Sequence, residues 1–233
     1  MHQDDIIMMS SLMTKIIFGN NFAVARKKNR TTAIFLNIFF STPYNAWIGG
    51  IFMRINNTTL EKVFDSDIQN HTIIIPSNIT EIENQAFWNR ETLTSIIIPK
   101  SVKEIKMYAF FGCKNLEEII IENDNCILGI GCFADCENLK KCKLPKNLTK
   151  LTDWMFYNCK SLETIKMPNT IISMSTTTFH GCKNLKEIYV SNLIPKISFS
   201  QFSDCSFLKK IYFHSHIYSY DDLIAYIDFK GDL

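Results

Sequence analysis

The chain has 233 residues, of which 46% are hydrophobic and 21% are charged, with only 8 glycines and 6 prolines. Such a composition can bury a core, which excludes a disordered or fibrous protein. The 25 basic and 23 acidic residues give a formal net charge of +2, too balanced for bulk attraction to nucleic acid or to an anionic membrane. The 8 cysteines are fewer than a disulfide-built secreted scaffold of this length would need.

Residues 1–49 follow no repeat pattern and carry no ordinary secretory signal. Asp4 and Asp5 place negative charge where a signal peptide is positive, and the apolar run after them is short. A basic cluster precedes the apolar run 33–40, which resembles a late signal or anchor but falls short of the ~20 residues that a membrane span needs. Three alternatives stay open: a helix over 6–18 that caps the first repeat, an anchor, or a poorly ordered tail.

Residues 50–72 are a candidate degenerate repeat. Phe52 and Phe64 fall in register with the units that follow. Two later columns are broken here, because Asn70 stands in the Leu column and Asp67 in the Cys column. We therefore place the regular repeats after this stretch.

Residues 73–213 repeat with a period of 23 residues. Six full units begin at residues 73, 96, 119, 142, 165 and 188, and a final strand begins at Ile211. The fifteenth place of every full unit is Phe and the twenty-first is Leu, while Pro recurs at the fourth place and Cys at the eighteenth in most units. The Phe column comprises Phe87, Phe110, Phe133, Phe156, Phe179 and Phe202. Repeats of this length are typical of a solenoid.

The residues around each unit boundary predict a short strand. Ile119–Ile121 is one such run of branched residues. Because a returning segment joins equivalent strands of successive units, those strands run parallel, about 4.8 Å apart. We therefore predict an α/β-type leucine-rich-repeat solenoid with a curved parallel β-sheet, mostly β and coil, and with short helices at the ends.

Residues 214–233 predict a C-terminal cap helix. Asp221 and Asp222 stand where a helix N-terminus favours acidic residues, and apolar residues recur three and four places apart as far as Ile227. This helix would close the solenoid at its C-terminal end.

The columns resemble the cysteine-containing leucine-rich repeats of BspA-like surface proteins, whose pattern is close to C-x-x-L-x-x-I-x-I-P-x-x-V-x-x-I-x-x-x-A-F. Residues 113–133 read CKNLEEIIIENDNCILGIGCF, and residues 159–179 read CKSLETIKMPNTIISMSTTTF. The unit at 119 departs from the pattern, with Glu122 in place of Pro and Asn125 in place of a branched residue. The resemblance implies a curved binding scaffold, in several members a surface antigen or adhesin. A cell-surface location follows from it, and a cytoplasmic one if no export signal operates.

Residues that could carry chemistry form no catalytic, cofactor-binding or metal-binding motif. One Cys per unit would point in parallel with its neighbours, so we expect buried free thiols. The four cysteines within 126–142 lack the paired short spacings of a zinc site. His214 and His216 have no third ligand nearby, and no glycine-rich phosphate loop or nucleophile elbow occurs. We predict no enzyme and no cofactor.

The informative positions lie on the outward face of the strands, at the second place of each unit, because the core does not need them. The candidate partner-binding residues there are Ile97, Ile120, Lys143, Lys166, Tyr189 and Tyr212. The row is aliphatic at one end and aromatic at the other, and aromatic residues are enriched at protein interfaces. We interpret the charges beside it as cross-strand pairs, and a second aromatic row beside the Phe column as packing at the outer turn.

The sequence thus predicts a non-catalytic protein–protein interaction scaffold that binds a protein or peptide on the concave sheet, and no nucleic acid. The alternative is a structural or antigenic repeat protein with no dedicated ligand.

Overall fold

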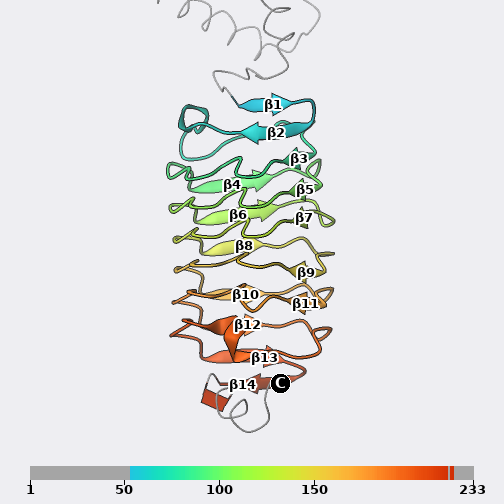
Figure 1. Cartoon of the computed structure of the whole chain (residues 1–233), viewed down its shortest axis with the longest axis vertical. Helices are drawn as coiled ribbons and strands as arrows, with labels where there is room; N and C mark the ends of the chain where they lie inside the picture. Colours follow the sequence, from blue (N-terminus) through green and yellow to red (C-terminus); the bar gives the residue numbers. More distant parts are fainter. Residues whose placement is uncertain (1–52, 220, 223–233) are drawn as a thin grey trace, which may run out of the picture.

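The structure is a computed structural model that describes residues 53–219 and 221–222. The turns of the chain stack along one long axis, and each full unit contributes one turn (Figure 1). The expected N-terminal helix over 6–18 and the apolar run 33–40 lie outside the described residues. Within the described part, no helix is long and apolar enough to cross a membrane.

Two rows of parallel strands run along the solenoid (Figure 1). The first row comprises β4 (Ser95–Ile98), β6 (Glu118–Ile121), β8 (Lys141–Lys143), β10 (Thr164–Lys166), β12 (Glu187–Tyr189) and β13 (Lys210–Phe213). We call the outward side of this row the strand face. The second row comprises β3 (Glu81–Ile82), β5 (Glu104–Ile105), β7 (Ile127–Leu128), β9 (Lys150–Leu151) and β11 (Ser173–Met174).

The register of the strands follows the repeat of the sequence. Ile96 pairs with Ile119, and Ile188 pairs with Ile211, each 23 residues further along the chain. The predicted repeat solenoid with parallel strands is therefore confirmed. Regular helix is limited, among the described residues, to two short 3-10 turns, η1 (Asp65–Asp67) and η2 (Phe199–Phe202), and to helical backbone at 221–222.

Both ladders are interrupted near the middle of the solenoid. In the first row, β4, β6 and β8 form one sheet, and β10, β12 and β13 belong to another. In the second row, β7 ends one sheet and β9 pairs only with β11. Other contacts therefore hold the turns together in this region. Those on the side of the Phe column continue without interruption.

The Phe column forms a stack of fully buried rings inside the solenoid. Ring centroids of successive units lie between 4.4 and 6.4 Å apart, from Phe87 to Phe202. On this side the backbone N–H of one unit bonds the carbonyl of the next, as Phe133 does to Met155 at 3.2 Å. These rings and the Leu column supply the core that the parallel strands cover.

The turn that follows each core Phe needs a left-handed backbone. The seventeenth place of every full unit has a positive φ, between 55° and 77°. The residues there are Asn89, Gly112, Asp135, Asn158, Gly181 and Asp204. Asn, Asp and Gly are the residue types that adopt this conformation at least cost, so the column encodes the turn directly.

An antiparallel hairpin begins the described part of the solenoid. β1 (Arg54–Asn56) pairs with β2 (Thr59–Lys62), and β2 pairs in parallel with β3, with Leu60 opposite Ile82. Leu60 precedes Ile82 by 22 residues, one fewer than the repeat. The hairpin thus joins the second row of strands with a shifted register.

The turn after β2 is also shorter than in the next unit, because Val63 follows Leu60 by three residues whereas Phe87 follows Ile82 by five. The N–H of Val63 donates to the carbonyl of Ala86 at 2.8 Å. In the next unit the N–H of Phe87 donates to the carbonyl of Ala109 at 2.7 Å, so Val63 takes the place of Phe87. Val63 is fully buried, whereas Phe64, expected in register, is 42% exposed. The sequence register of Phe64 was wrong because residues are missing from this turn.

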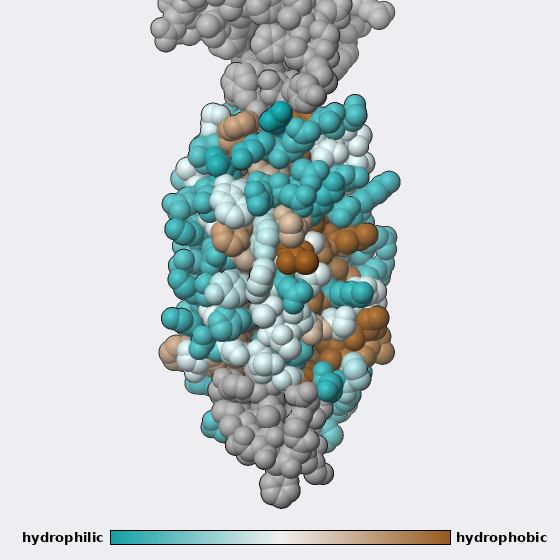
Figure 2. Space-filling model, viewed as in Figure 1, coloured by the Kyte–Doolittle hydropathy of each residue, from teal (hydrophilic) through white to brown (hydrophobic). Residues whose placement is uncertain are grey.

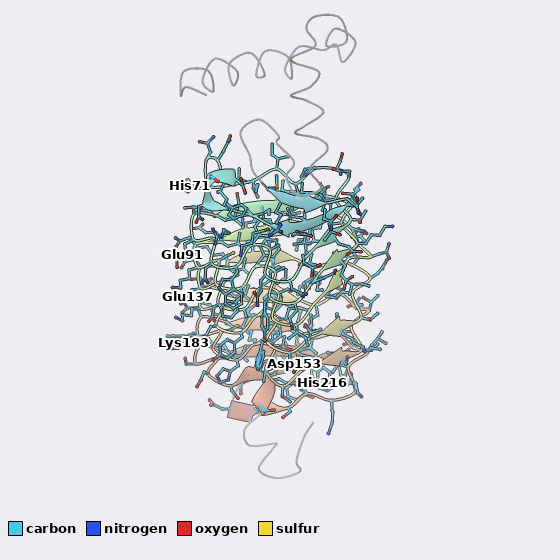
Figure 3. All side chains as sticks on the ribbon, turned by 45° about the horizontal axis from the view of Figure 1, so that its top comes forward. His71, Glu91, Glu137, Asp153, Lys183 and His216 are labelled. Atoms are coloured by element: carbon cyan, nitrogen blue, oxygen red, sulfur yellow. The ribbon has the colours of Figure 1, made fainter. Side chains whose placement is uncertain are left out.

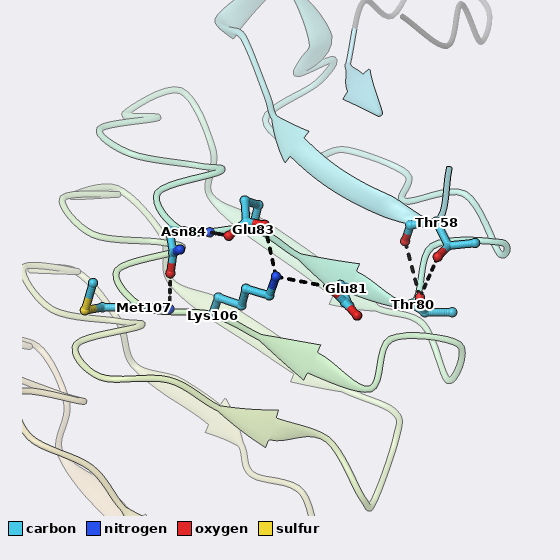
Figure 4. Close-up of polar contacts among 7 residues, drawn as sticks. All are labelled: Thr58, Thr80, Glu81, Glu83, Asn84, Lys106 and Met107. Atoms are coloured by element: carbon cyan, nitrogen blue, oxygen red, sulfur yellow. Dashed lines mark hydrogen bonds and ion pairs between the residues drawn. The ribbon is translucent and has the colours of Figure 1, made fainter. Parts of the chain in front are cut away.

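Side chains also join the hairpin to the first unit, and the first unit to the second (Figure 4). Lys106 Nζ lies 3.1 Å from a carboxylate oxygen of Glu81 and 3.0 Å from one of Glu83. Hydrogen bonds to Glu83 and Glu81 hold the pKa of Lys106 above its usual value. Thr80 Oγ1 donates to Thr58 Oγ1 at 2.9 Å. These polar contacts add ties between units on top of the strand ladder.

The C-terminal end is a second antiparallel hairpin, which we did not predict. β14 (His216–Tyr218) pairs with β13 through a turn at His214 and Ser215, both with positive φ. The expected helix over 214–233 therefore cannot begin at 214. Ser219 and Asp222 exchange hydrogen bonds as a capping box, each backbone N–H donating to the other side chain at 3.0 Å. Most of the expected helix lies outside the described residues.

Candidate functional site

The six candidate partner-binding residues lie on the strand face, one on each strand of the first row. Ile97, Ile120 and Lys143 pair in register across β4, β6 and β8. Lys166, Tyr189 and Tyr212 do so across β10, β12 and β13. The interrupted ladder separates the two groups of three. In β4 and β6 the second place points out while its two neighbours are fully buried, so the core does not use it.

The N-terminal end of the strand face is aliphatic. Ile97 is 55% exposed on β4, and Ile120 next to it is half-buried. Ile74, at the second place of the first unit, is also exposed. An isoleucine at an exposed strand position keeps apolar surface in water, which costs free energy unless a partner covers it.

The C-terminal end is aromatic and ordered. The rings of Tyr189 and Tyr212 stack with centroids 4.2 Å apart and planes 3° from parallel. A hydrogen bond with Tyr212 is the main cause of a raised pKa at Tyr189, to which Glu187 adds its negative charge. The two rings therefore present one rigid aromatic edge.

Ile217 extends this end and was missed by the sequence interpretation. The hairpin places Ile217 on β14 directly opposite Tyr212, and its side chain is 63% exposed. Turns at His214 and Ser215 lack the Asn-Gly or Asp-Gly signal of a two-residue hairpin, so the pattern gave no warning. The aromatic end thus consists of Tyr189, Tyr212 and Ile217.

The charges beside the row form pairs between neighbouring units. Lys140 lies 3.0 Å from Glu117, and Lys210 lies 3.1 Å from Glu187. A further charged column follows the edge of the solenoid, where Figure 3 shows Glu91, Glu137 and Lys183 in one line. Lys114 pairs with Glu91 at 3.3 Å and Lys160 with Glu137 at 2.8 Å. All are solvent-exposed or partly so, which limits each pair to about 0–1 kcal/mol.

The strand face is hollowed where its ladder is interrupted. A depression of about 790 Å³ lies between β6, β8 and β10, and we call it the lysine hollow. Its lining residues are Glu118, Ile119, Ile120, Lys140, Lys141, Cys142, Lys143, Ser161, Glu163, Thr164 and Asn184. Cys142 holds the first place of its unit, which is Ile in every other unit. A smaller side chain at that place leaves volume unfilled beneath the face.

The cysteines offer little reactivity. All eight are free, and each of the five in the Cys column donates from Sγ to a Phe carbonyl 26 residues earlier at 3.0 to 3.3 Å. Burial raises the pKa of Cys113 and of Cys142 to about 12, and that of Cys159 well above its usual value. Thiols in this state are protonated at neutral pH and are poor nucleophiles.

Metal ligation finds no site in the described part of the chain, where no three His, Cys, Asp or Glu side chains converge. The carbonyl of Asn192 lies 3.1 Å from His214 Nε2, and the carbonyl of His214 lies 2.8 Å from His216 Nδ1. Both imidazoles are exposed at the C-terminal turn. Their contacts are those of a hairpin turn.

The outer-turn row also packs on itself. Trp88 stacks on Phe111 with centroids 4.4 Å apart, and Tyr157 stacks on His180 at 5.3 Å. Elsewhere, Figure 2 shows hydrophobic residues gathered on the flank that carries β7 and β11. Ile127 there is 62% exposed, but its register partner Glu104 is charged. Charge therefore interrupts the apolar surface of this flank at Glu104.

Residues 57–159 and 113–223 match the family described as BspA type leucine rich repeat region, in six copies. The chain belongs to this BspA type family. The match spans β2, all six units and β14. The leucine-rich-repeat fold and family are generally non-enzymatic and generally bind proteins.

This BspA type chain is similar to solved structures, and one of them shares its fold with a TM-score above 0.5. A leucine rich repeat protein of T. pallidum has 20% sequence identity and a TM-score of 0.63, over 72% of this chain and 81% of that one. The pneumococcal vaccine antigen PcpA has 18% identity and a TM-score of 0.46, over 73% and 36% of the two chains. A leucine rich cell surface protein of Faecalibacterium prausnitzii has 23% identity and a TM-score of 0.41, over 68% and 58%. No curated protein matches the chain significantly.

Proposed function

We propose that the chain is a non-catalytic scaffold that binds a protein or peptide through the strand face. The observation that carries this proposal is the composition of the second place along the first row of strands. Solvation alone would favour polar residues at this outward place, yet four of the six candidate residues are Ile or Tyr. These residues supply apolar and aromatic contacts of the kind that protein interfaces use.

Rigidity of the row supports the same proposal. Each candidate residue stands on a strand, and the tyrosine pair is already stacked before any partner arrives. Side chains that are fixed in the free protein lose less conformational entropy on binding. Tyrosine in particular offers a large contact area with few rotatable bonds.

A catalytic role has no support among the described residues. Seven of the eight thiols are buried and that of Cys142 is partly buried, all with raised pKa values. The titratable residues that line the lysine hollow are Cys142, two glutamates and three lysines, with no histidine or aspartate among them. We therefore infer that the chain performs no reaction. Turnover of a substrate by the purified chain that survives loss of Tyr189 and Tyr212 would contradict this.

Site-directed photo-crosslinking tests the binding proposal. Benzoylphenylalanine in place of Tyr212 should give a discrete, saturable adduct with a partner protein, because that ring lies at the centre of the aromatic end. The matched control carries the same group in place of Lys150, an exposed residue of β9 in the second row. The adduct should be absent from the control and lost on Tyr189→Ser. Equal labelling from both positions would favour a structural or antigenic repeat protein with no dedicated ligand.

The resemblance to BspA-like surface proteins extends the proposal to a surface antigen or adhesin. The test is surface labelling of intact cells that express the chain with a tag at each end. Labelling of the chain outside the cell would support the extension. If the chain keeps residues 1–49 and stays inaccessible to the label, the surface antigen or adhesin extension is wrong. That outcome would not affect the proposal that the strand face is a binding surface.

A further inference from the structure

The middle of the strand face carries positive charge that the protein does not neutralise. Lys143 and Lys166 stand in neighbouring units at the second place, and neither forms an ion pair within the described residues. The charge of Lys143 is felt at Asp124, but Asp124 already pairs with Lys146 at 2.9 Å. Lys141, outward on the same strand, lies 4.0 Å from its nearest acid, Glu118. By contrast, the Lys–Glu ion pairs on both sides of this region are close.

The fold also makes room at this point. The lysine hollow lies beside Lys143, where Cys142 replaces an isoleucine and the ladder between β8 and β10 is interrupted. Ile120 forms one wall of the hollow. The stacked tyrosines stand on β12 and β13, which follow β10 in the first row of strands. A partner therefore meets apolar surface, then positive charge over a depression, then aromatic surface.

Resting on the proposed function, we propose that the strand face recognises an extended peptide segment with an acidic residue between two apolar residues, each two places away. From Ile120 to Tyr189 is three strand spacings, or about 14 Å. An extended segment rises about 3.3 Å per residue, so side chains four places apart on one side lie about 13 Å apart. The side chain midway between them then falls between Lys143 and Lys166. One carboxylate can reach both ammonium groups from there.

The surrounding charges favour a narrow acidic segment over a broad anionic surface. Glu118 and Glu163 line the lysine hollow, and Glu187 stands beside Tyr189. A membrane or a nucleic-acid backbone would bring its negative charges close to these acids as well as to the lysines. A segment that carries one carboxylate between apolar side chains avoids them. The row of Ile and Tyr also has no use in phosphate binding.

The first experiment selects displayed random short peptides on the immobilised full chain. Peptides that also bind the Tyr189→Ser/Tyr212→Ser variant are removed, so that the survivors depend on the strand face. We expect enrichment of the pattern apolar-x-acidic-x-apolar. Survivors without an acidic residue would overturn this inference and leave the proposed function standing. A complete lack of survivors would contradict both.

The second experiment measures fluorescence anisotropy of a labelled peptide containing Leu-Ser-Glu-Ser-Tyr. Lys143→Ser/Lys166→Ser should weaken binding roughly five- to thirtyfold at low salt, since two exposed ion pairs are lost. The control Lys100→Ser/Lys150→Ser removes the same charge from a loop and from β9, and should leave binding unchanged. Lys143→Glu/Lys166→Glu should bind a peptide with Lys in place of Glu, which a folding defect would not produce.

Two results would overturn the proposal at this stage. One is failure of the charge test: either Lys143→Ser/Lys166→Ser leaves the affinity unchanged, or the Glu peptide does not bind at all. The other is sedimentation of the wild-type chain with phosphatidylserine vesicles that the lysine variant loses while the Glu peptide fails to bind. The second result would assign the lysines to an anionic surface.

Discussion

The ring of Tyr108 stacks on that of Trp154, two units further along, with centroids 6.2 Å apart. The residue between them in the thirteenth place is Gly131, and a Cβ there would lie 2.3 Å from Tyr108 Cε1. The missing side chain lets Tyr108 lie across the intervening unit. Gly131 also has a φ of 56°, which an L side chain adopts at a cost.

We expect Gly131→Ala to lower the free energy of unfolding by about 2 kcal/mol, from the left-handed φ and from the clash with Tyr108. Urea unfolding followed by circular dichroism measures this. In a Tyr108→Ala background the clash disappears, so the cost of Gly131→Ala should fall to that of the φ alone, about 1 kcal/mol. An equal cost in both backgrounds would show that Tyr108 does not use the space above Gly131.

The Phe column gives a second prediction. Phe133 is fully buried between Phe110 and Phe156, so Phe133→Ala should cost about 3–5 kcal/mol in unfolding free energy. Phe207 offers a matched control, because it is 55% exposed and outside the column. Phe207→Ala should change stability by less than about 0.5 kcal/mol. Similar costs for the two variants would mean that the ring stack does not hold the units together.

The repeat could be predicted because each column meets the same surroundings 23 residues later. A Phe or Leu that fits one turn therefore fits the next, and the pattern accumulates over six units. The seventeenth place, filled only by Asn, Gly or Asp, carried a second signal for a left-handed turn. This signal runs through all six units.

The irregular features escaped prediction because none of them repeats from unit to unit. Val63 replaces Phe64 in the core because the first turn is shorter than the repeat. Ile217 joins the strand face through a turn with no common hairpin signal. The interrupted ladder next to Cys142 depends on packing across two units, which no column of one residue type expresses. The sequence therefore predicted the row of candidate residues on the strand face but did not predict the lysine hollow.

Buried thiols make the stability fall at alkaline pH. The pKa of Cys113 is raised from 9.0 to about 12 by burial, and burial also raises those of Cys136 and Cys159 well above 9.0. Above pH 9 the unfolded chain loses thiol protons that the folded chain keeps, so unfolding is favoured as the pH rises. The stability contributed by the protonated thiols is complete below pH 9 and is lost between 9 and about 12.

Each buried thiol should add about 1.4 kcal/mol per pH unit to the slope of unfolding free energy against pH in that window. Urea midpoints at several pH values measure the slope. Cys136→Ala/Cys159→Ala should reduce it by about two thiol contributions, whatever the variant costs in absolute stability. Because Lys and Tyr groups titrate equally in both proteins, they cancel in the difference. An unchanged slope would indicate that these thiols ionise in the folded state.

The volume left by Cys142 gives the last prediction. Isoleucine fills the same place in every other unit, so Cys142→Ile should raise the unfolding free energy by about 0.5–2 kcal/mol by filling the space beneath the strand face. The reciprocal variant Ile165→Cys removes volume from a fully packed place and should lower it by about 1–2 kcal/mol. Urea unfolding of both variants beside the wild type gives the comparison. If Cys142→Ile is destabilising instead, the place is already filled, overpacking strains it, and the lysine hollow has another origin than the missing isoleucine.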